Sequence, residues 1–333
     1  MNTPSSPLPP AVDHLDLDTM PAGTISRRRL NMVADGLGRP VRMPLLIARG
    51  VKPGPVLGIT AAVHGNELNG IPVVHALLKG LNLQRLAGTV LAVPAVNVPG
   101  LLEQQREFND DRDLNHLFPG RADGTGAQVW AWRFLDRVVR RVDYLVDLHT
   151  ASFGRVNSLY VRADMSDPVV ANMARLQQPQ IIVHNPPADG TLRGAAAALE
   201  IPAITVELKD PHRFQVGVIK KSVLGIRRLM ASLGMIAPSK LPSLAPPALC
   251  QSSYWIYTPV GGLLSVLPEV TDRVAAGEVV ARVRDVYGDL VLEHRAPEDG
   301  IVIGKSVNPV AQTGARVLHL GLVDDGAGEE SAR

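Results

Sequence analysis

Residues 56–63 have the sequence Val-Leu-Gly-Ile-Thr-Ala-Ala-Val, and residues 64–67 continue it as His-Gly-Asn-Glu. The first eight form an almost entirely apolar run of strand length, typical of a strand that is covered on both faces of a sheet. Helical patterns follow, notably over residues 128–141 and 215–233. Further apolar runs lie between and around them, at residues 89–93, 144–148, 181–183 and 203–206. This alternation predicts an α/β domain with a largely parallel sheet flanked by helices.

The regions on either side of this pattern differ from it in composition. Residues 23–49 contain short apolar stretches around Asp35-Gly36, which is a hairpin signal. Four prolines fall between residues 238 and 247, and short valine-rich runs separated by glycine follow them. The sequence therefore predicts four regions: an N-terminal tail (1–22), an α/β domain (23–238), a Pro-rich linker (239–250) and a small all-β domain (251–325).

The valine-rich segment contains a weak internal repeat. Gly262 is followed by Gly277 after fifteen residues, and Gly300 is followed by Gly314 after fourteen, with β-like runs around each glycine. Two similar halves predict a small barrel or sandwich with pseudo-twofold symmetry. Chance similarity between valine-rich strands is the alternative.

Composition narrows the functional class. The chain has 333 residues, of which 46% are hydrophobic and 20% charged, with a formal net charge of +2. We therefore expect no nucleic-acid partner and no membrane partner, since the charge is near neutral and no run of 18 apolar residues is present. Cys250 is the single cysteine, which excludes an internal disulfide and a thiolate cluster. Without a secretory pattern at its start, the protein is expected to be cytoplasmic.

The segment after the first buried run carries candidate metal ligands. His64 and Glu67 lie at a strand-to-helix turn, where an imidazole and a carboxylate three residues apart can converge on one zinc ion. His149, at the end of another apolar run, is the best third ligand, and Asp147 would lie on the same strand face and orient it. On spacing alone, ordinary hydrogen-bonded residues at strand ends remain an alternative.

A second group of residues can act on a substrate. Glu207 is a carboxylate in an apolar strand, a position expected for a general base or for a buried ion pair with Lys209 or an arginine. Four cationic residues, each with a plain surface role as the alternative, can stabilise an oxyanion or clamp a carboxylate. They are Arg106, Arg112, His116 and Arg193.

Together these motifs resemble the succinylglutamate desuccinylase and aspartoacylase family, the zinc-carboxypeptidase-like acylases. The matching features are His64-Gly-Asn-Glu67, Asp113-Leu-Asn115 with Phe118-Pro-Gly120, Asp147-Leu-His149 and Thr205-Val-Glu207. The resemblance covers residues 25–235, and the C-terminal segment is similar to the family's β-barrel domain, which is related in shape to biotinyl and lipoyl domains. It implies a zinc-carboxypeptidase-like mixed, largely parallel sheet in a zinc hydrolase domain, plus a small barrel-sandwich domain.

The resemblance also implies roles for single residues. It makes His64, Glu67 and His149 the ligands of one zinc ion per chain. Glu207 would be the general base that activates zinc-bound water and then protonates the leaving amine, and Arg106 would polarise the oxyanion.

The substrate-binding residues follow less directly from the resemblance. Asn115 would contact the substrate. Arg193 would bind a carboxylate of the substrate or make a structural contact. His116 stands where the family usually has an arginine that binds the α-carboxylate of the substrate. The carboxylate can therefore be absent, lie elsewhere, or bind Arg193 or Arg112.

The expected function is that of a zinc-dependent amidohydrolase. It would remove a small acyl group from an N-acyl amino acid or related N-acyl amine through attack of zinc-activated water. The alternatives are a metallocarboxypeptidase acting on small peptides, a carrier of a swinging cofactor, and a non-catalytic zinc-binding protein. The partner would be a small N-acyl substrate, and a homo-oligomer is compatible with the sequence.

Overall fold

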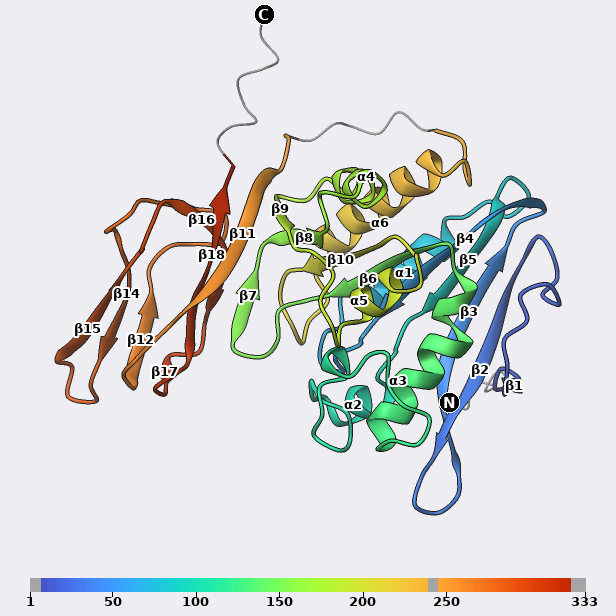
Figure 1. Ribbon diagram of the computed structural model, residues 1–333, viewed down its shortest axis with the longest axis horizontal. Helices are drawn as coiled ribbons and strands as arrows, with labels where there is room; N and C mark the ends of the chain where they lie inside the picture. The colour runs from blue at the N-terminus through green and yellow to red at the C-terminus, as the bar shows by residue number, and fades with distance from the viewer. Residues whose placement is uncertain (1–6, 239–244, 325–333) are drawn as a thin grey trace, which may run out of the picture.

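The computed structural model describes residues 7–238 and 245–324. Figure 1 shows a large sheet with helices on both faces and a β-rich C-terminal part beside it. The helices are α1 (Gly70–Lys79), α2 (Val98–Glu103), α3 (Gly126–Arg137), α4 (Pro168–Leu176), α5 (Leu192–Ala197) and α6 (Val216–Ser232), with 3-10 turns at Leu114–His116 and Val139–Arg141. The strands of the N-terminal part are β1 (Ala11–Val12), β2 (Thr24–Ala34), β3 (Pro40–Arg49), β4 (Lys52–Ala61), β5 (Ala87–Val93), β6 (Tyr144–His149), β7 (Arg155–Asn157), β8 (Leu159–Ala163), β9 (Ile181–His184) and β10 (Ala203–Leu208).

The large sheet is mixed, with a parallel centre. Its strands follow the order β1-β2-β3-β5-β4-β6-β10-β8-β9, and the path continues into the C-terminal part. Strands β5, β4, β6 and β10 are parallel neighbours, whereas β3 and β8 run antiparallel on either side of them. The carboxyl ends of the four central strands therefore meet at one edge of the sheet, which is where open α/β sheets place their sites.

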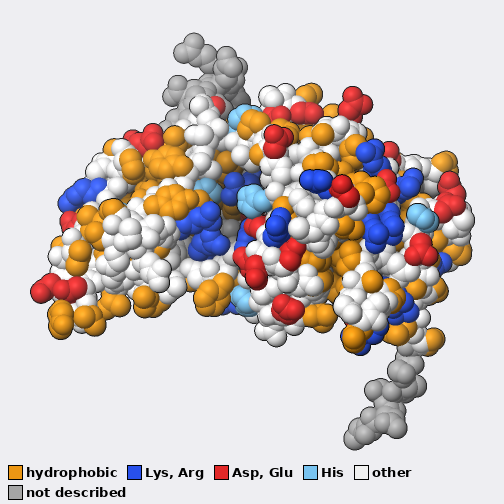
Figure 2. Space-filling view, turned by 60° about the horizontal axis from the view of Figure 1, so that its bottom comes forward, with side chains coloured by type: hydrophobic (Ala, Val, Ile, Leu, Met, Phe, Trp, Pro, Cys, Tyr) orange, Lys and Arg blue, Asp and Glu red, His pale blue; other side chains and the backbone are white. Residues whose placement is uncertain are grey.

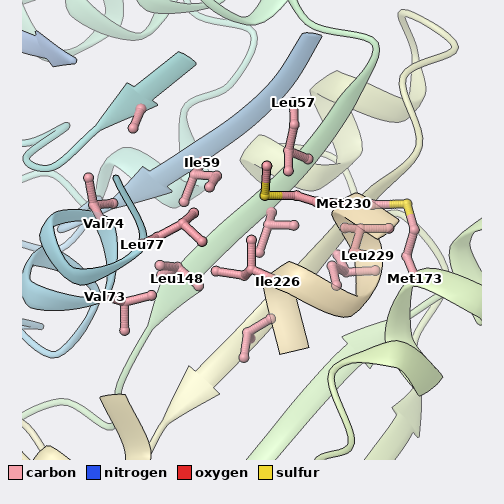
Figure 3. Close-up of a cluster of buried hydrophobic side chains, with 14 of the residues drawn as sticks. Leu57, Ile59, Val73, Val74, Leu77, Leu148, Met173, Ile226, Leu229 and Met230 are labelled. Atoms are coloured by element: carbon pink, nitrogen blue, oxygen red, sulfur yellow. The ribbon is translucent and has the colours of Figure 1, made fainter. Parts of the chain in front are cut away.

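Two hydrophobic cores hold the helices against the sheet. Leu57 and Ile59 of β4 face α1 and α6, and Ile226 and Leu229 of α6 pack on the same side (Figure 3). The opposite face of the sheet packs against α3 and α5, with Trp130 fully buried. Because successive strand residues alternate between these two faces, the apolar side chains of β4 are buried on both sides of the sheet.

The C-terminal part is built from β11 (Ala248–Tyr257), β12 (Gly262–Val266), β13 (Arg273–Val274), β14 (Val279–Arg284), β15 (Leu290–Arg295), β16 (Gly300–Ser306), β17 (Val310–Ala311) and β18 (Arg316–Val323). Strand β12 pairs with β14, and β16 pairs with β18. The short strands cross over, since β13 pairs with β16 and β17 pairs with β12. This reciprocal exchange confirms the two similar halves predicted from the glycine spacing.

The two parts share one sheet. Strand β11 pairs in parallel with β9, and β7 pairs with β16, so hydrogen bonds run across the junction at two places. The domain boundaries given above stay predictions, but two of the regions contain more structure than expected. Strand β1 lies in the stretch predicted as a tail, and β11 begins at Ala248, inside the stretch predicted as a linker. Residues 1–6, 239–244 and 325 of those predicted regions lie outside the described residues.

The predicted hairpin and buried strands are confirmed. Strands β2 and β3 are connected around Asp35, and the five apolar runs correspond to β4, β5, β6, β9 and β10. Strands β7 and β8 were not anticipated, because Arg155, Asn157 and Arg162 interrupt their apolar pattern. No helix among the described residues is long and apolar enough to cross a membrane.

Candidate active site

The His64–Glu67 segment forms a tight turn between β4 and α1. Its path is fixed where β4 ends, because the backbone N–H groups of Val96 and Asn97 donate to the carbonyls of Ala61 and Ala62 at 2.9 and 2.8 Å. Gly65 packs directly against the backbone of α2, and a Cβ atom there would lie 2.0 Å from the carbonyl carbon of Gly100. Glycine between the histidine and Asn66 is therefore a steric requirement of the turn.

Strands β6 and β10 supply the other acidic and imidazole groups. His149 is the last residue of β6, and Asp147 lies two residues earlier on the same face. Glu207 of β10 is the direct parallel partner of His149 in the sheet, as Thr205 is of Asp147. The register thus brings Glu207 beside the histidine at the carboxyl edge of the sheet.

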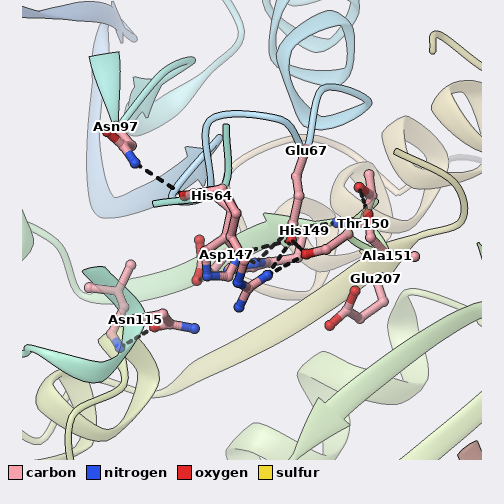
Figure 4. A network of polar contacts seen from close by, with 12 residues as sticks. His64, Glu67, Asn97, Asn115, Asp147, His149, Thr150, Ala151 and Glu207 are labelled. Atoms are coloured by element: carbon pink, nitrogen blue, oxygen red, sulfur yellow. Dashed lines mark hydrogen bonds and ion pairs between the residues drawn. The ribbon is translucent and has the colours of Figure 1, made fainter. Parts of the chain in front are cut away.

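The three predicted ligands converge in the interior of the protein. Their ligand atoms lie within 4.8 Å of one another, and all three side chains are buried (Figure 4). The Nδ1 atoms of His64 and His149 are 3.2 Å apart, and each lies close to a Glu67 carboxylate oxygen, at 2.9 and 3.0 Å. Two imidazole nitrogens and a carboxylate facing one point form a donor set that suits a divalent ion such as zinc.

The outer nitrogen of each imidazole is held by a carboxylate. His149 Nε2 lies 2.7 Å from Asp147, and His64 Nε2 lies 3.1 Å from Asp113. A carboxylate behind a histidine fixes the tautomer whose other nitrogen is free to bind a metal, and it increases the basicity of the ring. The residues therefore fit a metal centre, with the Nδ1 atoms directed inward.

The pKa values of the clustered side chains reflect the charges of their neighbours. Burial raises the pKa of Glu67, but the charge of His64 and the hydrogen bond from His149 outweigh it and hold that pKa well below its usual value. Burial lowers the pKa of His149, yet Asp147 and Glu67 together bring it well above the ordinary value. The carboxylates of the cluster thus favour a positive charge among them, which a bound metal cation would also supply.

Glu207 lies next to the ligand cluster without joining it (Figure 4). It is 9% exposed, accepts a hydrogen bond from Asn157 at 3.3 Å and has Arg162 Nε at 3.8 Å. Burial raises the pKa of Glu207, and the charges of His149 and Arg162 oppose that rise in part. The alternative partner considered for Glu207, Lys209, is not the cation found beside it; Arg162 is.

Arg106 is tied to the acids around the ligand cluster. Its guanidinium donates to Glu67 Oε1 at 3.0 Å and to Asp113 Oδ2 through Nε at 3.0 Å, and it also contacts Ser152 Oγ. Burial lowers the pKa of Arg106, but Glu67 and Asp113 raise it above the ordinary value overall. The arginine therefore holds its positive charge at the metal-ligand cluster.

The pocket next to the cluster has a volume of about 360 Å³, and most of the predicted substrate-binding residues line it. Asn115 accepts a hydrogen bond from the backbone of Leu192 at 2.8 Å, while the side chain of His116 is 73% exposed and lies 3.7 Å from Asp113. Arg193 is buried and donates to the carbonyl oxygen and side chain of Asn185.

Arg193 and Arg112, two of the predicted substrate-binding residues, differ in burial and in their position relative to the pocket. Burial, followed by the charge of Arg162, lowers the pKa of Arg193 to about 10. Arg112 is exposed on the loop before Asp113 and does not line the pocket. Of the two arginines considered as substitutes for the missing arginine at position 116, the structure therefore brings only Arg193 to the site.

Several pocket residues were not anticipated from the sequence. They are Arg155, Asn157, Tyr160 and Arg162 from β7 and β8, and Trp255 and Arg316 from the C-terminal part. The first four belong to short strands without a clear apolar alternation. The last two lie 48 and 109 residues beyond Glu207 in the chain, and the pairings of β11 with β9 and of β16 with β7 join their part of the sheet to the site.

Glu67 faces two histidines, and each histidine is held by a further carboxylate, at one end of a polar pocket. This arrangement is typical of an α/β hydrolase with a metal centre. A catalytic-domain model matches residues 53–233, and its description is that of the succinylglutamate desuccinylase/aspartoacylase catalytic domain. The chain belongs to this family, whose activity is deacylation.

Individual relatives agree with this assignment. The chain is 24% identical over 267 residues to the N-alpha-acetyl-L-2,4-diaminobutyric acid deacetylase of Halomonas elongata, covering 76% of this chain and 78% of that protein. The product-bound ectoine utilization protein EutE (DoeB) from Ruegeria pomeroyi has a TM-score of 0.82 at 21% identity, with 91% and 98% of the two chains covered. A succinylglutamate desuccinylase/aspartoacylase from Rhodobacter sphaeroides has a TM-score of 0.81 at 22% identity, covering 93% and 98%. These structures share the fold of this chain.

Proposed function

We propose that the protein is a zinc-dependent deacylase that hydrolyses the amide bond of a small N-acyl amino acid or related N-acyl amine. The observation that carries the proposal is the position of Glu207, a buried carboxylate beside, but outside, a complete His-Glu-His ligand set. The zinc dependence and a carboxypeptidase-like arrangement of the sheet are parts of this proposal. The relative from Halomonas elongata, named for an N-acetyl amino acid, supports the substrate class.

His64, Glu67 and His149 would hold the ion, which supplies Lewis-acid polarisation when it is bound. Asp113 and Asp147 keep the two imidazoles oriented toward it. Glu207 takes the proton of the attacking water and then delivers it to the nitrogen of the leaving amine. Burial raises the pKa of Glu207 and so makes its carboxylate a stronger base toward the attacking water.

Arg106 holds its positive charge beside the ligand cluster and would offset the negative charge that develops on the carbonyl oxygen. The pocket residues would bind and orient the substrate on the other side of Glu207. A volume of about 360 Å³ is at the lower end of the range for small-molecule sites. The pocket therefore favours a small N-acyl compound over a peptide, the substrate of the carboxypeptidase alternative.

A cofactor carrier requires an accessible lysine at a hairpin tip. The tip between β14 and β15 consists of residues 285–289 and has no lysine. Lys305 lies inside β16, where it is buried and forms an ion pair with Glu269 at 2.7 Å. These positions favour a catalytic over a carrier role for the chain.

The test is amine release from N-acetyl amino acids with neutral, acidic and basic side chains, with di- and tripeptides alongside. Glu207→Gln should keep stoichiometric zinc and lose turnover by at least about a hundredfold, the contribution typical of a general base. Glu103→Gln, at the exposed end of α2, is the matched control and should behave like the wild type. Normal turnover by Glu207→Gln would remove this residue from the mechanism, and faster cleavage of peptides would favour the carboxypeptidase.

A further inference from the structure

The C-terminal part of the chain forms one wall of the pocket. Trp255 of β11 and Arg316 of β18 line it together with Arg155 of β7. The indole of Trp255 is stacked on His319 of the neighbouring strand, with ring centroids 5.0 Å apart and an interplanar angle of 13°. Because His319 is buried, this stacking holds the indole in a fixed place at the junction of the two parts.

Two guanidinium groups lie against the same indole. Arg155 Cζ is 5.8 Å and Arg316 Cζ is 5.3 Å from the centroid of the Trp255 ring, both within cation–π range. Arg155 is half-buried and Arg316 is exposed at the rim of the pocket. Figure 2 shows Lys and Arg side chains gathered near the middle of the molecule, where the two parts meet.

The charges in the pocket are unevenly balanced. Of the five arginines that line it, Arg106 is paired with Glu67 and Arg162 with Glu207. Arg193 is bonded to the neutral groups of Asn185 and Pro186. Across residues 7–238 and 245–324, neither Arg155 nor Arg316 forms an ion pair with a carboxylate, and both guanidinium groups lie against the indole.

Two like charges beside one ring repel each other. Burial lowers the pKa of Arg155, and the positive charges of Arg316 and Arg106 lower it further, while the charges of Glu67 and Glu207 oppose this shift in part. An anion bound between the guanidinium groups of Arg155 and Arg316 would relieve the repulsion between them. Arginine is suited to this task because its planar fork binds a carboxylate through two hydrogen bonds.

The segment around His116 is poorly placed to do the same. The His116 side chain points largely into solvent, and its nearest acid, Asp113, already holds His64 and Arg106. A substrate carboxylate approaching there would meet a carboxylate that is already present. Of the three pocket arginines that form no ion pair within the described residues, Arg193 already donates to Asn185 and Pro186, so the two on the wall shared with the C-terminal part are better placed to receive an anion.

We propose that Arg155 and Arg316, held against Trp255, form the subsite that binds a carboxylate of the substrate. The junction between the two parts of the chain thus selects an anionic substrate, a role that position 116 cannot fill here. This inference rests on the proposed function, since it takes the bound anion to be part of the compound that is deacylated.

The first test compares N-acetyl-L-alanine with N-acetyl-L-alaninamide, in which a neutral carboxamide replaces the carboxylate. The zinc-loaded wild type should prefer the acid by about tenfold or more in kcat/KM, as expected for a charge-assisted bond to arginine. Arg155→Met and Arg316→Met should each reduce that ratio strongly, mainly through KM for the acid. The control is Arg284→Met. Arg284, at the end of β14, donates a hydrogen bond to the carbonyl oxygen of Gly288 in the hairpin, so this variant should keep the wild-type ratio.

The second test measures binding without turnover. Calorimetry of zinc-loaded Glu207→Gln with the same two compounds should show tighter binding of the acid, and the preference should disappear when Arg316→Met is added. If the protein hydrolyses none of the N-acetyl amino acids of the first experiment but this preference is found, the proposed function fails and the two arginines remain a carboxylate-binding site. Equal binding of acid and amide, a preference unchanged in both arginine variants, or one abolished only by Arg193→Met would overturn the subsite.

Discussion

Asp147→Asn should weaken zinc binding without unfolding the protein. Asp147 accepts hydrogen bonds from the hydroxyl of Thr60 at 2.6 Å and from His149 Nε2 at 2.7 Å, all in the interior. Asparagine has the same shape, so its oxygen can still face His149 while its NH₂ group donates to the Thr60 hydroxyl. The change therefore removes the negative charge and little else.

The magnitude follows from the loss of that charge. A hydrogen bond to a charged group contributes about 1.5–3 kcal/mol, and a neutral one about 0.5–1.5 kcal/mol. The difference, about 1–1.5 kcal/mol, corresponds to roughly a tenfold loss of zinc affinity. Carboxylates behind metal-binding histidines typically affect metal affinity by about 10–100-fold, so the expected range begins at this value.

The assay is competition for zinc against a chromophoric chelator at fixed pH, with circular dichroism to confirm that each variant is folded. Asp123→Asn is the control, because Asp123 is exposed and its ion-pair partner is Arg121 on the same loop. A zinc affinity of Asp147→Asn within twofold of the wild type would refute the reasoning, since the carboxylate would then have no influence on His149.

Three other perturbations test the site and the fold. The raised pKa of His149 stabilises the metal-free protein; this contribution is complete below about pH 6.5 and is lost as the pH rises through the raised pKa. Because zinc competes with the same proton, the measured zinc affinity should increase as the pH rises over this range. A zinc affinity that does not change with pH would contradict the assignment of His149 as a ligand. Gly65→Ala should abolish stoichiometric zinc binding, measured by metal analysis of the purified protein, because its Cβ would overlap the backbone of Gly100; full zinc content would show that the turn can move. Ile226→Ala should lower the free energy of unfolding by about 2–5 kcal/mol in urea denaturation, because this fully buried side chain packs α6 on the sheet, and a loss below about 1 kcal/mol would mean that the core collapses around the cavity.

The parts of the fold that could be predicted are those whose signal is local. The strand runs of β4, β6 and β10 are continuous and apolar, and the motifs in and after them, together with the family resemblance, make His64, Glu67, His149 and Glu207 the site candidates. The parallel register then places Glu207 beside His149, a relation that no local pattern contains.

The opposite wall of the pocket could not be predicted, because its residues come together through strand pairing and not through a local sequence pattern. Arg155 and Arg162 lie on β7 and β8, strands whose side chains alternate between a charged pocket and the core too briefly to give a periodic signal. Trp255 and Arg316 owe their place to pairings between distant strands, of β11 with β9 and β18 and of β16 with β7, and nothing in their own sequence surroundings indicates a ligand. Arg112 shows the reverse case, a cation next to a motif that the loop turns toward solvent.

The continuous sheet across the junction has a consequence for how such a protein can be cut or recombined. A truncation that removed β11 and all that follows would leave β9 as an open edge, with the backbone of Ile181, Ile182 and Val183 unpaired on one side. An exposed apolar edge strand recruits other chains, so the shortened protein would be prone to aggregate as well as lacking a pocket wall. The C-terminal part is therefore not an interchangeable module, and a gene fusion or domain swap would have to preserve the register of β11 against β9.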